Sequence, residues 1–349
     1  MANVQKYFEE FHSAIRLGRF SDEATLSEKR DIIRLKLETR LPAEFAKRGE
    51  ECPPKRFADQ GSYEMGTGIK PVAGDCDIDQ GLYFELDSDA FPDPVDLKKV
   101  VRDSLEGHTD KVLIRRSCVT VFYQREGEDI FHVDLGIYRE SGKNVPPKLI
   151  GKGKEQSTSE FRFWEASDPA GLSDWFRKDL DTAERKQTRR LVRCLKRWKD
   201  ENFSVDGHSA PTGIALTVGV RSKYAAQFSD ALAKTPNDLA ALSSVITSLL
   251  GQFHTVVGAE GNALHRLEVR LPVEPYGDLL EAMSDKQAES FYQKMTILKV
   301  ALLEAENAVD PIDACKCLRS VFGEDFPVPD PSETASKVAP TVLKSSASA

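Results

Sequence analysis

Two aspartates at alternate positions in a strand-like run constrain the fold of this chain more than any other feature. Asp77 and Asp79 lie in the segment from Cys76 to Leu86, whose apolar residues also alternate. Side chains on a strand point to opposite faces in turn, so we expect Asp77 and Asp79 to share one face. A glycine-rich turn with a free hydroxyl, Gly61-Ser62, lies just upstream. Carboxylates beside such a turn indicate metal-assisted chemistry on a phosphorylated substrate.

A third carboxylate lies on a second predicted strand, Ile130 to Tyr138. Apolar and polar residues alternate along it, which places Asp134 on the polar face. This alternation is typical of an antiparallel sheet with one buried face. Three carboxylates can hold two divalent ions, and magnesium prefers carboxylate oxygens. Asp77, Asp79 and Asp134 are therefore the candidate metal ligands.

Periodicity elsewhere predicts the order of the elements. A helix is expected from Thr25 to Arg48, with a capping box at its start and a kink or break at Pro42. Lys111 to Tyr123 is predicted to be one strand. Further along the chain the apolar spacing becomes helical, in three segments: Asp181 to Asn202, Pro236 to Gln252 and Asp285 to Val309.

Three regions follow from this order. We expect a catalytic lobe over residues 1–165, with a long amino-terminal helix, and a helical lobe over residues 166–328. Residues 329–349 are rich in Pro, Ser, Thr and Ala with little to bury, so we expect a flexible tail.

Charge, cysteine content and hydropathy indicate which partners and which cellular location to expect. The chain has 349 residues and a formal net charge of −8, which argues against binding long nucleic acid through bulk electrostatics. Its six cysteines are scattered and show no zinc-site spacing, as in proteins of the reducing cytoplasm. No apolar run approaches the length of a membrane span. We expect a cytoplasmic protein with no membrane contact.

The motifs together resemble a known family. Gln60 to Thr67, Asp77-Ile78-Asp79 and Val133-Asp134-Leu135 are similar to the signature of polymerase-β-type nucleotidyltransferases. Within that superfamily the chain most resembles the bacterial cGAS/DncV-like nucleotidyltransferases, which make cyclic di- or oligonucleotide signals in anti-phage defence. The resemblance implies an α+β fold, with a mixed or antiparallel sheet in the catalytic lobe, a helical carboxy-terminal lobe and the active site in the cleft between them.

The resemblance also assigns roles to residues. Asp77, Asp79 and Asp134 become the catalytic metal triad, which holds two Mg²⁺ ions or Mn²⁺ in their place. The triphosphate contacts implied are Gly61, Ser62, Lys196, Ser209 and Thr212. For Ser209 and Thr212, ordinary helix capping explains the hydroxyls equally well. Arg185 to Lys199 holds eight basic residues, and apart from Lys196 we expect them to form a solvated face.

By this resemblance the chain is a synthase that makes a cyclic second messenger from ATP, GTP or other nucleoside triphosphates. The product would act on a downstream effector in CBASS-type signalling, and an E1/E2-like partner would conjugate the carboxy-terminal tail. No zinc-ribbon insertion is present, which argues against activation by long double-stranded DNA. Two alternatives stay open: a template-independent transferase acting on RNA or protein, and a catalytically silent regulatory member of the fold.

Overall fold

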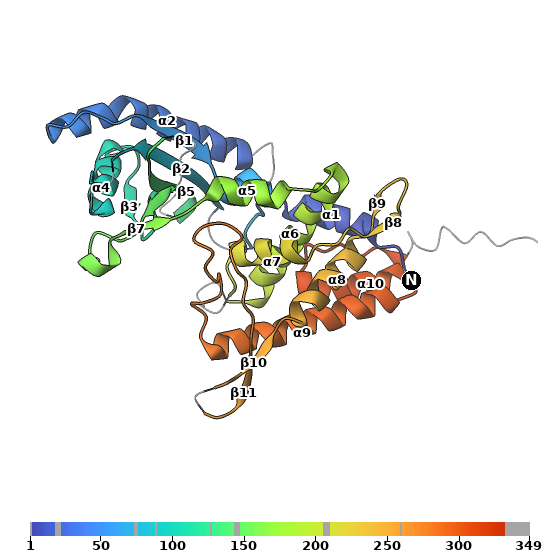
Figure 1. The fold of residues 1–349 in the computed structure, drawn as a ribbon. Helices are drawn as coiled ribbons and strands as arrows, with labels where there is room; N and C mark the ends of the chain where they lie inside the picture. Colours follow the sequence, from blue (N-terminus) through green and yellow to red (C-terminus); the bar gives the residue numbers. More distant parts are fainter. Residues whose placement is uncertain are drawn as a thin grey trace, which may run out of the picture.

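A seven-stranded mixed sheet forms the centre of the amino-terminal lobe (Figure 1). Its strands are β1 Lys55–Asp59, β2 Cys76–Glu85, β3 Lys111–Ile114, β4 Cys118–Arg125, β5 Glu128–Glu140, β6 Leu149–Gly151 and β7 Trp164–Ala166. The main order is β1-β2-β5-β4-β3, and β6 pairs with both β5 and β7. The computed structural model describes residues 2–17, 22–72, 76–87, 89–125, 128–142, 147–204, 210–258 and 260–331.

Two helices cover one face of this sheet, α2 Asp22–Lys47 and α4 Pro94–Ser104. Ile33 and Leu37 of α2 and Leu97 of α4 are fully buried in one cluster with the apolar residues of β2 and β5. The opposite face carries the alternate residues of the same strands. There Tyr83 and Tyr138 stack with their ring centroids 4.3 Å apart. The period-two pattern of β2 and β5 thus directs their polar residues away from α2 and α4.

Helices build the second lobe (Figure 1). They are α5 Pro169–Arg177, α6 Thr182–Asn202, α7 Gly213–Lys223, α8 Asp238–Leu250, α9 Asp285–Asn307 and α10 Pro311–Phe322. Two short hairpins accompany them, β8 Phe228–Asp230 with β9 Thr235–Pro236 and β10 His254–Val257 with β11 Ala263–Arg266. A 3-10 turn, Ser159–Phe161, precedes β7. No helix in the described ranges is both long and apolar enough to cross a membrane.

The first helix, α1 Gln5–Ile15, packs into the core of the helical lobe. The rings of Phe8 and Phe326 pack edge to face with their centroids 5.3 Å apart, and the ring centroids of Phe11 and Phe322 are 5.4 Å apart. Its amphipathic pattern therefore buries its apolar side against α10 and the segment that follows. The division of the chain near residue 165 stays a prediction, and most of the tail, residues 332–349, lies outside the described residues.

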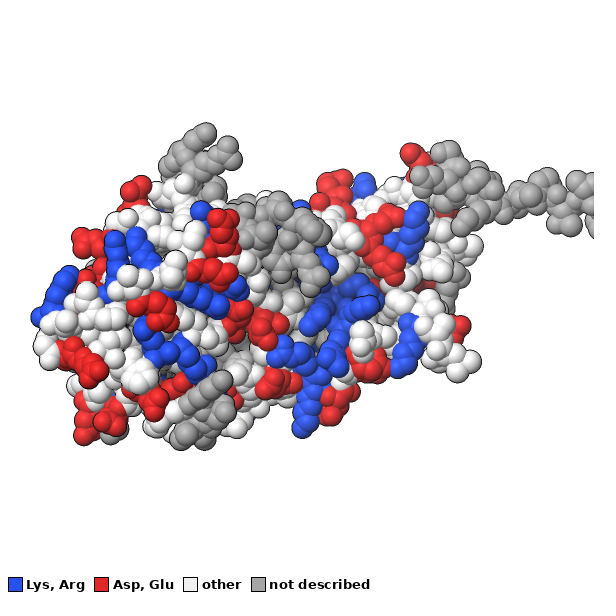
Figure 2. Space-filling view, turned by 90° about the horizontal axis from the view of Figure 1, so that it is seen from above, with Lys and Arg blue, Asp and Glu red and all other residues white. Residues whose placement is uncertain are grey.

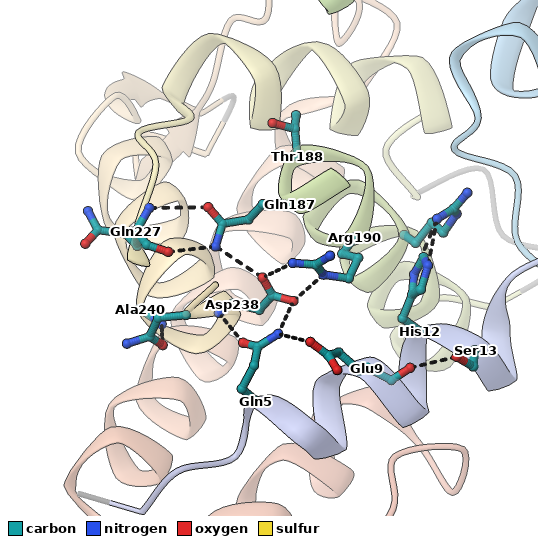
Figure 3. A network of polar contacts seen from close by, with 12 residues as sticks. Gln5, Glu9, His12, Ser13, Gln187, Thr188, Arg190, Gln227, Asp238 and Ala240 are labelled. Atoms are coloured by element: carbon teal, nitrogen blue, oxygen red, sulfur yellow. Dashed lines mark hydrogen bonds and ion pairs between the residues drawn. The ribbon is translucent and has the colours of Figure 1, made fainter. Parts of the chain in front are cut away.

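A buried polar network ties α1 to α6 and α8 (Figure 3). Asp238 is fully buried and accepts hydrogen bonds from Arg190, from Gln187 Nε2 at 3.2 Å and from Gln5 Nε2 at 3.1 Å. Gln5 Oε1 in turn accepts from the backbone N–H of Asp238 at 2.8 Å. A buried carboxylate is tolerated because each of its oxygens is hydrogen-bonded and a guanidinium neutralises its charge.

One sequence expectation was wrong in detail: Lys111 to Tyr123 is two strands, β3 and β4, which form an antiparallel hairpin. Pro42 lies inside α2 and does not break it, and Leu41 and Phe45 on either side of it are buried. The sheet is mixed, since β2 and β5 run parallel while β4 and β5 run antiparallel. The three helices predicted in the second lobe are confirmed as α6, α8 and α9.

Replacing the buried carboxylate should weaken the junction of the three helices. Asp238→Ala leaves Arg190 as an uncompensated buried charge, and we expect the free energy of unfolding to fall by about 3–5 kcal/mol. Urea denaturation measures this change. The exposed Asp313, on α10, serves as the control, because Asp313→Ala should change stability by no more than about 0.5 kcal/mol. Equal stability of the two variants would contradict a structural role for the network.

Candidate active site

A cleft of about 700 Å³ separates the two lobes. Gly61, Ser62, Asp77 and Asp79 line it from the sheet lobe, and Lys196 faces them from α6. Asp77 and Asp79 lie on the face of β2 that the sequence predicts. The parallel register sets Asp79 beside Asp134 on β5, and Asp77 beside His132. Strand pairing therefore brings the third predicted carboxylate to the first two.

Asp77, Asp79 and Asp134 lie close enough for their negative charges to repel one another. Burial, together with the nearby charges of Asp77 and Asp134, raises the pKa of Asp79 to about 7, against the opposing effect of Lys196 and His132. Like charges that share a site disfavour the ionised form. The carboxylate cluster is therefore short of positive charge.

Gly61 is required by the way its helix packs on β2. The short helix α3, Gly61–Met65, starts with Gly61 at φ +63°. A Cβ atom at this position would lie 1.9 Å from Asp79 Oδ2. The backbone N–H of Gln60 also donates to the carbonyl of Asp79 at 3.1 Å. The absence of a side chain thus lets the backbone of α3 reach the carboxylate pair.

A ladder of four cations on α6 holds the segment that follows α3. Arg189, Arg193, Lys196 and Arg197 recur at helical spacing on one face. They donate to the backbone carbonyls of Met65, Gly66, Thr67, Gly68 and Lys70. Arg193 and Arg197 are only 7% and 4% exposed. The expectation of a solvated basic face was therefore wrong for Arg193 and Arg197, because the carbonyls beyond the end of α3 have no helical partners and accept hydrogen bonds from these cations.

Lys196 is the member of the ladder that interacts electrostatically with the carboxylates Asp77 and Asp79. Its Nζ donates to the carbonyl of Thr67 at 3.2 Å. Burial lowers the pKa of Lys196 to about 8, although Asp77 and Asp79 act in the opposite direction. Gly213 lies beside it, where a Cβ atom would be 3.5 Å from Lys196 Cε. The ammonium group can thus contribute positive charge to an anion in the cleft.

The other predicted phosphate contacts are placed differently. Thr212 caps α7, since its Oγ1 accepts from the backbone N–H of Ala215 at 3.2 Å. Its neighbour Gly213 lines the cleft, as does Ala210. Ser209 lies outside the described residues. The capping explanation accounts for Thr212, and the phosphate roles of both residues stay predictions.

Sequence reasoning did not find the further carboxylates in the cleft. Asp168, which caps α5, Asp200 on α6 and Glu274 all line it, together with Lys199. No sequence pattern links these residues, because they come from three separate elements that only the fold brings together. Lys199 is paired with Asp200 at 2.8 Å.

The donor set suits divalent cations. Among the described residues that line the cleft are five carboxylates and two lysines, so a triphosphate would be repelled without added positive charge. In that same part of the chain, no three His, Cys, Asp or Glu side chains already form a ready-made metal site. Magnesium commonly takes one or two carboxylates and completes its shell with water and substrate phosphates. The residues therefore fit a metal that binds together with the nucleotide.

Comparison with known proteins finds a family match for part of the chain. Residues 55–138 match the family described as cyclic GMP-AMP synthase DncV-like, nucleotidyltransferase domain. This segment is similar to a DncV-like nucleotidyltransferase domain and makes up less than half of the chain. The matched segment runs from β1 to β5 and includes Gly61, Asp77, Asp79 and Asp134. The resemblance to the bacterial cGAS/DncV-like nucleotidyltransferases is thereby confirmed.

A curated relative, the cyclic GMP-AMP synthase of Escherichia albertii, is 28% identical over 175 residues. That stretch is 47% of this chain but only 36% of the relative, so the match spans well under two thirds of the relative's length.

Solved structures extend the likeness of fold to nearly the whole chain. Vibrio cholerae DncV cyclic AMP-GMP synthase, in complex with nonhydrolyzable GTP, has a TM-score of 0.69 at 17% identity and covers 93% of this chain and 97% of its own. Bradyrhizobium diazoefficiens CdnG, in complex with GTP, has a TM-score of 0.68 at 15% identity, with 92% and 96% covered. The predicted α+β class with a helical carboxy-terminal lobe is confirmed.

A side chain at Gly61 should displace the carboxylate pair. Gly61→Ala places a methyl group against Asp79, and we expect the rate of pyrophosphate release from nucleoside triphosphates to fall by about 100-fold, since displacements of about 1 Å in an active site have that effect. Gly107 is the matched control. It also has a positive φ, +66°, but a Cβ atom there would have nothing within 4 Å. Gly107→Ala should carry the same cost of a left-handed backbone, roughly 1–2 kcal/mol, without the steric clash, and should leave the rate unchanged.

Proposed function

We propose that this protein is a synthase that joins nucleoside triphosphates into a cyclic di- or oligonucleotide. The observation that carries the proposal is that Asp77 and Asp79 line one cleft together with Lys196, while the parallel pairing of β2 with β5 sets Asp134 beside Asp79. The confirmed nucleotidyltransferase domain contains all three carboxylates. The cyclic GMP-AMP synthases among the similar proteins support the choice of a cyclic product.

In the proposed mechanism Asp77, Asp79 and Asp134 would hold two Mg²⁺ ions, or Mn²⁺. Such ions would lower the pKa of a 3′-hydroxyl, which attacks the α-phosphate of a second nucleotide, and would neutralise the pyrophosphate that leaves from that phosphate. Lys196 adds charge at the triphosphate, and Gly61 with Ser62 bounds the phosphate end of the cleft. Catalysis then rests on positioning and on charge neutralisation. Ring closure repeats the first reaction in the same cleft on a linear intermediate.

The proposed function also includes the substrates, the signalling pathway and a protein partner. Among the solved relatives, CdnG is in complex with GTP, Escherichia coli CdnC is bound to ATP, and one further structure is a complex of CdnC with a HORMA protein. We propose ATP and GTP as substrates, a soluble product that acts on an effector in CBASS-type anti-phage defence, and conjugation of the tail by an E1/E2-like partner. The acidic lining of the cleft supports small nucleotides over a long nucleic-acid acceptor.

Removal of the carboxylate pair tests the mechanism. We expect the double variant Asp77→Ala with Asp79→Ala to release no pyrophosphate from the four labelled ribonucleoside triphosphates with Mg²⁺, while its melting curve still shows a folded protein. The wild type should give phosphatase-resistant products without any added acceptor, and Asp313→Ala should match it. A fully active double variant would exclude the metal mechanism, and a strict need for RNA or protein would favour the alternative transferase.

Lys196 should matter for substrate binding. Lys196→Ala removes a charge-assisted contact to the triphosphate, and such contacts contribute about 1.5–3 kcal/mol, so we expect KM for the nucleotide to rise by about 10- to 100-fold. Steady-state kinetics at saturating Mg²⁺ measure the change. Lys199→Ala is the control, because Lys199 is already paired with Asp200 and should shift KM much less. Equal shifts in the two variants would argue against a specific role for Lys196.

A further inference from the structure

Asp134 differs from the other two carboxylates in its surroundings. Asp77 and Asp79 are among the described residues that line the cleft, whereas Asp134 lies one strand away on β5 and is 24% exposed. A carboxylate in that position can turn either oxygen toward a cation. Its orientation must therefore be set by the side chains packed around it.

Thr120 fixes one of these oxygens. It lies directly across from Asp134 in the antiparallel pairing of β4 with β5. Its Oγ1 donates to Asp134 Oδ1 at 2.6 Å, a short distance that is typical of a hydrogen bond from a hydroxyl to a carboxylate. Thr120 is fully buried, so water does not compete for this bond. As a β-branched residue it also has few rotamers to lose.

The thiol of Cys118 forms a hydrogen bond with Thr120, which in turn donates to Asp134. Cys118 projects from the same face of β4, and its Sγ lies 3.4 Å from Thr120 Oγ1. The single proton of the hydroxyl points to Asp134, so the thiol donates to the hydroxyl oxygen. Burial raises the pKa of Cys118 to about 12, which keeps this donor protonated. Hydrogen bonds arranged head to tail strengthen one another.

The other oxygen of Asp134 has a longer contact, to a histidine on the same strand. Asp134 Oδ2 lies on the side of His132, 3.7 Å from its Nε2, where β5 runs beside the Asp77 and Asp79 strand. With Oδ1 held by Thr120, the carboxylate presents one oxygen in a fixed direction. Groups that orient a metal ligand in this way commonly change metal affinity 10- to 100-fold when removed.

We propose that Thr120 is a positioning residue for the nucleotidyl-transfer reaction, which turns Asp134 so that Oδ2 can bind a divalent cation. This inference rests on the proposed function of Asp134 as a metal ligand. Thr120 itself touches neither metal nor nucleotide.

Direct measurement of Mn²⁺ binding tests this role without reference to turnover. Mn²⁺ is titrated into the full chain, with and without a nonhydrolysable triphosphate, and free Mn²⁺ is followed by electron paramagnetic resonance. Thr120→Val keeps the shape but loses the hydroxyl, and we expect the Kd for Mn²⁺ to rise by about 10- to 100-fold. Thr120→Ser keeps the donor and should restore affinity to within about threefold of the wild type, on the order of 0.6 kcal/mol.

Matched variants separate positioning from stability. Thr188 on α6 is also fully buried, and its Oγ1 donates to the carbonyl of Glu184 at 2.8 Å. It is not among the described residues that line the cleft. Thr188→Val should cost similar stability and leave Mn²⁺ binding unchanged. Cys118→Ala retains the threonine hydroxyl and should weaken binding less than Thr120→Val does. It also serves as the second test if Thr120→Val fails to fold.

The outcomes separate the positioning role of Thr120 from the role of Asp134 as a metal ligand. If Asp134→Asn weakens Mn²⁺ binding but Thr120→Val and Cys118→Ala do not, the positioning role is wrong and the metal triad stands. If Asp134→Asn binds Mn²⁺ as the wild type does, Asp134 is not a metal ligand, and the proposed mechanism fails together with the role of Thr120. If Thr188→Val weakens binding as much as Thr120→Val, the effect is one of general stability, which also overturns the proposal.

Discussion

The cation ladder on α6 is the interaction on which the rest of the active site depends. The segment after α3 turns away at Gly66 and leaves a series of carbonyls without partners in its own element. Basic side chains of α6 satisfy five of them, and the burial of Arg193 and Arg197 is tolerated because their charges are hydrogen-bonded in this way. The two lobes are therefore joined through backbone groups at the end of α3 and in the segment that follows it, and α3 itself carries Gly61 and Ser62.

This junction sets the distance between opposite charges across the cleft. Gly61 packs on Asp79 at one end of α3, and Lys196 binds the carbonyl of Thr67 beyond the other end. The pKa of Asp79 is raised and that of Lys196 is lowered, both chiefly by burial. The protein thus maintains a cluster of acidic groups with little compensation from its own cations. A site of this kind favours ligands that bring positive charge with them.

Strand pairing explains both what could be foreseen in the sheet and what could not. Alternation along β2 placed Asp77 and Asp79 on one face, because the two-residue period is a local property of any strand. The same alternation occurs in parallel and antiparallel sheets, so it could not reveal that β2 pairs in parallel with β5. That pairing depends on α4, β3 and β4 forming the connection between them. The position of Asp134 beside Asp79, and of Thr120 beside Asp134, follows from the pairing alone.

The sequence by itself determined the carboxylate pair, the glycine that precedes it, the helical lobe and the family of its nucleotidyltransferase domain. These depend on short-range periodicity and on motifs that are contiguous in the chain. Only the tertiary structure decided what the basic residues of α6 contact, that Thr212 caps α7, and which carboxylates share the cleft. A helix face can be read from spacing, but its partner cannot, because the free energy of a buried charge is set by groups distant in sequence that neutralise it.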